Sequence, residues 1–244
     1  MKKATSIYES ASHSWHVIAR DPQRPGCVID TNEYLITSAG QALITDPGGM
    51  EIFPAVFQAV GEVIDPAQVR VLFASHQDPD VISSLALWLE FQPQARCYVS
   101  ALWKTFIPHF GGDEQTLMAI PDAGMDIPLG PLMLRAVPAH YLHSSGNFHL
   151  YDPQARILFS GDIGAALLPH DQQGLFVEGF DSHIRHAEGF HWRWMGSNSA
   201  KRDWCERVSR LDIDLLCPQH GAIYRGEDVM RFINWLDELK VGIV

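Results

Sequence analysis

The sequence predicts a layered α/β or α+β domain. Short β-rich runs alternate with helical patterns along the 244 residues, and no Ser-, Pro- or Gly-rich linker divides them. The run at residues 69–75 (VRVLFAS) is almost entirely apolar, which is typical of a buried strand. Hairpins, buried strands and helices together favour layers packed around a common core, so we expect one domain over residues 1–244.

The first half of the chain contains a hairpin, two further strands and two helices. Residues 34–36 and 42–45 flank a Thr-Ser-Ala-Gly turn, and Asp46-Pro47-Gly48-Gly49 ends the second of these strands. The pattern predicts a helix over 51–60, with Pro54 near its first turn. The buried strand at 69–75 follows, then a helix over 81–91 and a strand over 96–100.

The second half is richer in strands. Residues 132–137, 148–151 and 157–160 are apolar runs separated by turn residues, so we expect consecutive antiparallel strands. Residues 214–217 form a last strand. The stretch 227–240 closes the chain as an amphipathic helix, with apolar residues at Val229, Phe232, Ile233, Leu236 and Leu239.

Composition excludes several classes of partner. With 29 acidic against 18 basic residues the formal net charge is -11, which argues against nucleic acid as a ligand. The four cysteines, Cys27 among them, form no CxxC pair, and no apolar leader follows Met1. No apolar run is long enough to cross a bilayer. We therefore expect a reduced, cytoplasmic protein without a membrane partner.

Histidine and aspartate at strand ends are the candidates for chemistry, because the chain has no phosphate loop, dinucleotide finger or serine elbow. Imidazole and carboxylate groups are ligands for first-row metals, and strand ends can bring them together from distant parts of a sequence. Six residues of this kind follow apolar runs: His76, Asp78, Asp80, His143, Asp162 and His220.

Each candidate also has a purely structural interpretation. Asp78-Pro79 is typical of a helix N-cap followed by Pro at the first helical position, with Asp80 as an acidic residue of the first turn. His143 and His220 could be hydrogen-bonded turn residues, and Asp162 could cap a loop. The metal hypothesis depends on the conjunction, because turn chemistry alone does not predict six such residues at successive strand ends.

The order of these residues carries a resemblance to a known superfamily. The chain reads His76-x-Asp78-x-Asp80, His143, Ser160-Gly161-Asp162 and His220-Gly221, with supporting segments at 31–36 (TNEYLI), 42–48 (ALITDPG) and 217–221 (CPQHG). This pattern resembles the metal site of the metallo-β-lactamase superfamily over about residues 30 to 225. The resemblance implies an αββα sandwich with the metal site at one edge.

Two departures from the superfamily pattern narrow the resemblance. Its zinc hydrolases carry HxHxDH, whereas Asp78 replaces the second His here and Val81 the last. The chain is thus similar to the flavodiiron branch, and more closely to its flavodoxin-less oxygen-binding diiron proteins. Segments 143–148 (HSSGNF) and 194–198 (WMGSN) also resemble that branch.

The resemblance implies a pair of irons. His76, Asp78 and His143 would hold one iron, Asp80 and His220 the other, and Asp162 would bridge them together with an oxo, hydroxo or peroxo group. Carboxylate in place of His favours a hard metal that must reach the ferric state, although zinc or manganese remains an alternative. Seven protein–metal bonds leave open positions in two octahedra of about six positions each.

Three functions follow from this site. Because 244 residues leave no room for a flavodoxin domain, our first hypothesis is a protein that binds dioxygen or nitric oxide, as a sensor with a signalling partner. The second is an oxygen or nitric oxide reductase that receives electrons from a separate flavin or rubredoxin-like protein. The third is a zinc-dependent hydrolase, in which a metal-bound water attacks a thioester or lactone carbonyl.

Further histidines allow two interpretations. His183 and His186 would share a helical face, and with His191 they could hold a ligand residue or shield an oxygen pocket; solvated residues of a surface helix are the alternative. His140 could hydrogen-bond near His143. His149 is interpreted as facing solvent.

Three tryptophans are interpreted as packing residues. We expect Trp192, Trp194 and Trp204 to pack in a core or on a dimer surface rather than to bind a cofactor, and we expect a homodimer.

Overall fold

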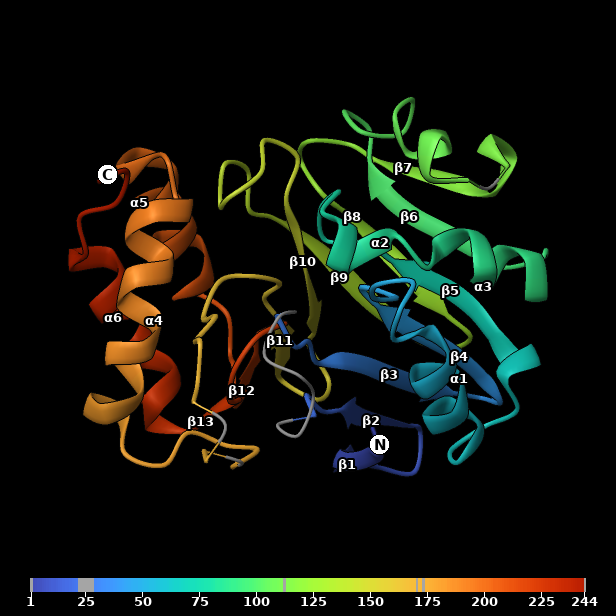
Figure 1. Cartoon of the computed structure of the whole chain (residues 1–244), viewed down its shortest axis with the longest axis horizontal. Coiled ribbons are helices and arrows are strands. Elements are labelled where there is room, and N and C mark those ends of the chain that lie inside the picture. Colours follow the sequence, from blue (N-terminus) through green and yellow to red (C-terminus); the bar gives the residue numbers. More distant parts are fainter. Residues whose placement is uncertain (1, 22–28, 112, 170, 173, 244) are drawn as a thin grey trace.

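The computed structural model describes residues 2–21, 29–111, 113–169, 171–172 and 174–243, so that Cys27 lies outside the described residues. Two β-sheets pack face to face, and helices cover both outer faces (Figure 1). Helices α1 (Phe53–Gly61), α2 (Pro79–Ile82) and α3 (Leu85–Phe91) lie on one side; α4 (Phe180–Trp194), α5 (Asn198–Val208) and α6 (Glu227–Glu238) lie on the other. This arrangement is the expected αββα sandwich.

The first sheet has seven strands in sequential order. Strands β1 to β4 are antiparallel neighbours, and β4 to β7 are parallel. Their bounds are β1 Ala4–Glu9, β2 His13–Ile18, β3 Glu33–Ser38, β4 Gln41–Thr45, β5 Val69–Phe73, β6 Arg96–Ser100 and β7 Leu117–Ile120.

The second sheet has six strands in the order β13-β12-β11-β10-β9-β8. Strands β8 to β11 form an antiparallel meander, and β12 joins β11 in parallel. Their bounds are β8 Met125–Leu129, β9 Leu132–Pro138, β10 Phe148–Asp152, β11 Ile157–Phe159, β12 Leu215–Cys217 and β13 Tyr224–Arg225. The carboxyl ends of β5, β11 and β12 carry the candidate site.

Three apolar layers hold the sheets and helices together. The middle layer lies between the sheets, where Phe159 contacts Tyr34 and Phe73 with ring centroids 5.5 and 6.3 Å apart. The outer layers pack each sheet against its own helices. Because both faces of the first sheet are covered, strand β5 is apolar apart from Arg70, as the run at 69–75 indicated.

The predicted helix over 81–91 is wrong as one element, because the chain forms α2 and α3 with a break between them. The Ser84 backbone N–H donates to the carbonyl of Gly48 over 3.1 Å, and its hydroxyl donates to the carbonyl of Pro47 over 2.8 Å. These bonds to the turn after β4 replace the intrahelical bond that a continuous helix needs at this position.

Several elements lie outside the sequence-based prediction. Strands β1, β2, β7, β8 and β13 and helix α5 were not expected, although residues 15–18 (WHVI) are rich in strand-forming side chains. None of the described helices is long and apolar enough to cross a bilayer.

Candidate metal centre

Six side chains meet where strands of both sheets end. His76 follows β5, Asp78 and Asp80 lie at the start of α2, and His143 lies in the connection between β9 and β10. Asp162 follows β11, and His220 follows β12. The ends of neighbouring strands in the two packed sheets thus supply all six candidate residues.

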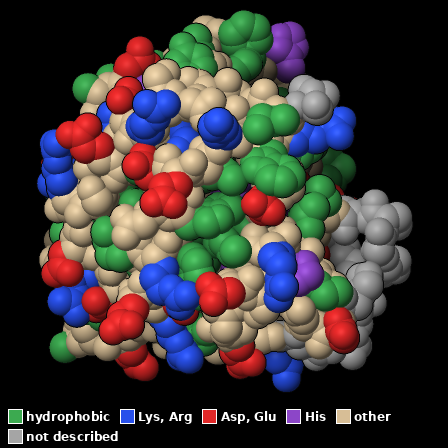
Figure 2. All heavy atoms as spheres, turned by 90° about the vertical axis from the view of Figure 1, so that its left-hand side faces the viewer, with side chains coloured by type: hydrophobic (Ala, Val, Ile, Leu, Met, Phe, Trp, Pro, Cys, Tyr) green, Lys and Arg blue, Asp and Glu red, His purple; other side chains and the backbone are tan. Residues whose placement is uncertain are grey.

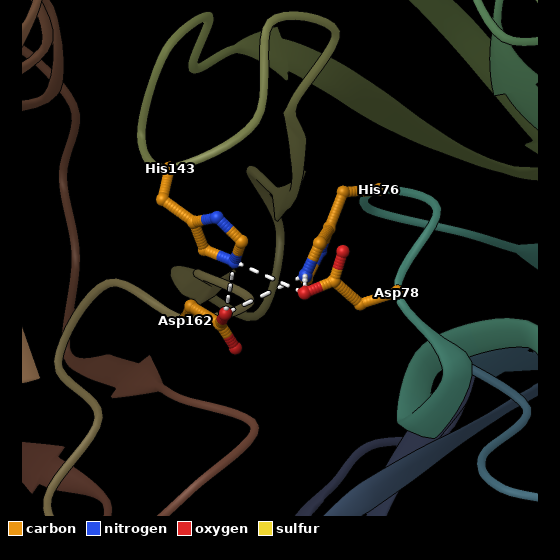
Figure 3. Close-up of side chains that lie close together, drawn as sticks. All are labelled: His76, Asp78, His143 and Asp162. Carbon is orange, nitrogen blue, oxygen red and sulfur yellow. Dashed lines mark ion pairs between the residues drawn. The ribbon is translucent and has the colours of Figure 1, made fainter. Parts of the chain in front are cut away.

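Four of these side chains form one tight group (Figure 3). His143 Nε2 lies 2.9 Å from Asp162 Oδ2 and 3.3 Å from Asp78 Oδ2. His76 Nε2 lies 3.4 Å from Asp162 Oδ2 and 3.6 Å from Asp78 Oδ2. The four ligand atoms lie within 4.8 Å of one another.

The remaining two residues form a second group on the other side of Asp162. His220 Nε2 lies 3.3 Å from Asp80 Oδ2 and 3.3 Å from Asp162 Oδ1. Asp162 therefore presents one carboxylate oxygen to each group. A carboxylate in this position can bridge two ions, one among His76, Asp78 and His143 and one between Asp80 and His220.

The donor atoms fit metal ions. Ligand atoms bound at about 2 Å to one ion, at right angles, lie about 3 Å apart, close to the separations above. In the described part of the chain, His76 Nε2, His143 Nε2 and Asp162 Oδ1 are buried without a hydrogen-bond partner. Buried polar atoms of native proteins normally have partners, so an ion accounts for these three better than an empty cluster does.

The structural interpretation of Asp78 as a helix cap holds for its backbone alone. Asp78 is the N-cap residue of α2, with extended backbone angles and Pro79 behind it, but its side chain makes no capping hydrogen bond. The carboxylate points to the two histidines instead. Val81, at the position where zinc hydrolases carry a further His, is fully buried in the outer core and offers no ligand.

Hydrogen bonds behind the histidines orient their rings. The Ser75 hydroxyl lies 2.8 Å from His76 Nδ1 and donates to Asp46 Oδ2 over 2.7 Å, so it accepts the Nδ1–H of His76. His220 Nδ1 donates to the carbonyl of Asp30 over 3.0 Å. In both rings Nε2 is left to face the carboxylates, which is the usual arrangement of a metal-ligating imidazole.

The charges of the metal-free site stabilise one another. Burial disfavours charged imidazole, but Asp162 and Asp78 outweigh it and raise the pKa of His143 to about 9. Burial likewise opposes protonation of His220, while Asp162 and Asp80 raise its pKa to about 10. Against its own burial, the Asp162 carboxylate is held by His76, His143 and His220, which keep its pKa well below its usual range. Metal ions would replace these protons.

Helix α4 contributes aromatic residues and a histidine whose positions near the site the sequence did not determine. The Trp194 ring lies 5.3 Å from that of His143 and stacks on Phe190, which is 6.4 Å from His220. His191 is fully buried, and its Nε2 accepts the backbone N–H of Gly164 over 3.1 Å. These aromatic rings cover the site, and His191 fixes the loop that follows Asp162.

The other histidines and tryptophans differ in part from expectation. His183 is buried, which excludes a solvated surface residue there, and His140 bonds the carbonyl of Asp122 rather than a candidate ligand. The expectation that His149 faces solvent is wrong, because it is fully buried under α5 and bonded to Trp204. Trp204 is a core residue, as one interpretation had it.

Known proteins that are similar to this chain match it over the region that contains the candidate site. A family model described as ODP family beta lactamase matches residues 29–221. An uncharacterised protein of Methanocaldococcus jannaschii is 23% identical over 208 residues, which make up 84% of this chain and 52% of that protein. The chain thus spans about half the length of this curated relative.

Solved structures are similar over nearly the whole chain. The apo state of the chemotaxis sensor ODP from T. denticola is 42% identical with a TM-score of 0.89, covering 98% of this chain and 96% of that one. A structure described as the peroxy diiron species of chemotaxis sensor ODP is 41% identical, with a TM-score of 0.87 and the same coverage. Rubredoxin oxygen:oxidoreductase from Desulfovibrio gigas, at 17% identity, a TM-score of 0.86 and coverage of 97% and 61%, shares the fold.

Proposed function

The chain belongs to the ODP family of beta lactamases, and from this premise we propose that it is a non-haem di-iron protein that binds dioxygen and serves as an oxygen sensor. The observation that carries the proposal is the position of Asp162, whose two carboxylate oxygens face two separate groups of histidine and aspartate. The similarity to a chemotaxis sensor recorded with a peroxy diiron species supports iron and dioxygen rather than zinc and an ester.

We assign the ligands by these groups. His76, Asp78 and His143 would hold one iron, and Asp80 and His220 the other, with Asp162 shared. The acidic residue at position 78 and the apolar Val81 at the place of a further His both lower the nitrogen count that zinc hydrolases use. Zinc is the metal that is compared with iron in the tests below.

Residues of the chain would hold the metal ions and shield them from solvent. An iron pair, when bound, supplies one-electron redox chemistry and coordination positions for a small gas molecule. Three carboxylates offset the charge of the cations, and Ser75 and the Asp30 carbonyl keep the imidazole rings turned toward them. Phe190 and Trp194 limit access of water and larger molecules from the side of α4.

Further proposals concern the organisation of the protein. We propose one di-iron domain over residues 1–244, a cytoplasmic location, and a separate partner that either reads the oxidised state or donates electrons. Nitric oxide is a second candidate ligand.

We also propose a homodimer. Trp192 and Trp194 on α4 are 40% and 49% exposed, and hydrophobic side chains gather across the helical side of the molecule (Figure 2). Light scattering of the purified protein tests the dimer.

The function is tested with protein loaded anaerobically with ferrous iron. On exposure to air we expect the protein to develop a charge-transfer absorption band. Oxygen uptake should then stop at about one dioxygen per iron pair. Sustained uptake should require an added flavin or rubredoxin-like electron donor, because continued reduction of dioxygen consumes electrons that the bound irons alone cannot resupply. The metal content of the same sample should be near two irons per chain.

Other outcomes reject the proposal. Continuous oxygen uptake with NADH alone would favour a reductase. Hydrolysis of thioesters or lactones by the zinc form, with no optical response of the iron form to oxygen, would reject both iron functions. Uptake of a single zinc, with no iron bound by the metal-free protein, would reject the di-iron assignment.

A further inference from the structure

A buried carboxylate fixes the ring of a histidine that joins the two sheets. His13, the first residue of β2, is 4% exposed, and its Nε2 lies 2.8 Å from Oδ2 of Asp152, the last residue of β10. The Trp15 indole N–H donates to the same oxygen over 2.8 Å. The other oxygen, Oδ1, accepts the backbone N–H groups of Gln154 and Ala155 over 2.9 and 3.0 Å. Both oxygens of Asp152 are therefore acceptors, so Nε2 of His13 carries the proton of their shared bond.

The second nitrogen of this ring accepts a proton from a serine. A neutral imidazole protonated at Nε2 presents a lone pair at Nδ1. The Ser12 hydroxyl lies 3.0 Å from Nδ1 of His13, and the Ser10 hydroxyl lies 3.4 Å away. Ser10 donates its proton to the carbonyl of His13 over 2.9 Å and accepts the backbone N–H groups of Ser12 and His13. Because these bonds fill the capacity of the Ser10 hydroxyl, Nδ1 is left to accept the proton of Ser12.

Ser12, His13 and Asp152 together have the geometry of an activated nucleophile. A hydroxyl within hydrogen-bond reach of a base, which a third group orients, is the arrangement that makes serine reactive. The base takes the hydroxyl proton as the oxygen attacks, and the carboxylate behind it stabilises the imidazolium that forms. Ser12 is exposed in the turn between β1 and β2, whereas His13 and Asp152 are buried. An electrophile can therefore reach the hydroxyl oxygen from solvent.

Packing accounts for only one side of the His13 ring. The bond between His13 and Asp152 joins β2 of the first sheet to β10 of the second, and it would stabilise the fold without a serine. The Ser12 hydroxyl belongs to an exposed residue that could bond water instead, so its bond to His13 adds little to stability. The bond changes the reactivity of Ser12, because it directs the hydroxyl proton to a base.

We propose that Ser12 is an acyl-accepting nucleophile, with His13 as its general base and Asp152 as the residue that orients the base. The substrate class is an activated acyl donor, for which an aryl ester is the probe. Ser12 Oγ forms a bond to the acyl carbon while its proton passes to Nδ1 of His13. The bond from the acyl carbon to the aryl oxygen breaks, and the phenolate leaves with the electron pair. The product is an ester on Ser12.

This activity is independent of the proposed di-iron function. Asp152 is the last residue of β10, whereas Phe148, the first residue of the same strand, bonds the carbonyl of Ser75 beside the candidate ligand His76. The nucleophile and the metal centre thus lie at opposite ends of β10. Metal-free protein can be used for the test, which prevents a metal-bound water from hydrolysing the probe.

The experiment treats the metal-free protein with p-nitrophenyl acetate. Mass spectrometry of the tryptic peptide 4–20 locates the acetyl group among its four serines, and absorbance follows the nitrophenolate that is released. We expect acetylation of Ser12 to exceed that of Ser14 by about tenfold or more. Ser14 is the internal control: its hydroxyl lies 2.9 Å from Nε2 of His16, but in the described part of the chain no carboxylate is bonded to His16.

Variants separate the three roles. Ser12→Ala, at an exposed position, should lose the fast phase of nitrophenolate release, whereas Ser14→Ala should keep it. Asp152→Asn can donate its amide N–H to His13, which moves the ring proton to Nδ1 and removes the acceptor for Ser12. Acetylation of Ser12 in this variant should fall by about 100-fold. Circular dichroism shows whether the variant is folded.

Three results would overturn the proposal. The first is equal acetylation of Ser12 and Ser14 in the folded, unmodified protein, which needs no variant. The second is a Ser12 acetylation rate that stays the same when urea unfolds the protein, since unfolding separates His13 from Asp152. The third is an unchanged rate in folded Asp152→Asn, which would show that the carboxylate only joins the sheets.

Discussion

His143 Nε2 lies 2.9 Å from Asp162 Oδ2, and the opposite oxygen of the same carboxylate lies 3.3 Å from His220 Nε2. Asp162 is buried, so it faces these imidazoles with little water to screen the interaction. Asp162 therefore differs from the other five candidate ligands. It would be shared by both metal ions, whereas each of the others would contact one ion.

Replacing Asp162 should affect both metals, whereas replacing Asp78 should affect mainly one. Asp162→Ala removes the shared ligand and leaves two cations facing each other without a carboxylate between them, so both should be lost. Asp78→Ala removes a ligand of one ion and should preferentially lose that ion. Metal analysis of the purified, folded variants measures this. Asp126→Ala, an exposed carboxylate on β8, is the control and should keep both ions; unchanged metal content in Asp162→Ala would reduce Asp162 to a loop cap.

Ser75→Ala should weaken metal binding although no ligand is changed. The Ser75 hydroxyl connects His76 Nδ1 to the buried Asp46 carboxylate, and such supporting bonds typically contribute about 10–100-fold to metal affinity. Competition against a chelator of known affinity measures the loss. Ser6→Ala, on the exposed side of β1, should not change it. Equal affinities of the two variants would show that the ring of His76 is held by packing alone.

Acid should destabilise the metal-free protein through His191. Burial lowers its pKa to about 4, with a partly opposing bond to the Ala187 carbonyl. An unfolded His, with a pKa near 6.5, takes up a proton at pH 5 that the folded residue does not. Stability from this residue is therefore full above about pH 6.5 and falls as the pH drops toward 4, by about 2 kcal/mol at pH 5.

The measurement compares urea unfolding of the metal-free protein at pH 7 and pH 5. His191→Gln keeps an acceptor for the Gly164 N–H but does not titrate, so its stability should fall less between these pH values than that of the unmodified protein. A fall of the same size in both would show that His191 does not contribute to acid sensitivity.

Phe159→Ala should destabilise the fold by about 3–5 kcal/mol, because it opens a cavity between the sheets. Phe159 is fully buried and contacts Tyr34 and Phe73 from the opposite sheet. Met133→Ala is the control, since Met133 is 47% exposed on β9 and should change stability by less than about 0.5 kcal/mol. Denaturant midpoints of the metal-free forms measure both changes, and a small effect at Phe159 would mean that the sheets close over the gap.

All six candidate ligands could be named from the sequence, and the structure brings all six together. The reason is physical: a polar residue directly after an apolar strand lies at a sheet edge, and several such edges meet in a layered fold. The hairpin at β3 and β4 and the helix α6 were predictable for a similar reason, since local turn chemistry and helical periodicity determine them.

What the sequence by itself determined was the layered class of the fold and the set of candidate ligands at the ends of its strands. The tertiary structure alone decided the break between α2 and α3, where Ser84 bonds Gly48, and the burial of His149 against Trp204. It also decided that Phe190 and Trp194 lie over the site. These features depend on contacts between residues far apart in the chain, whose energies no local pattern of side chains contains.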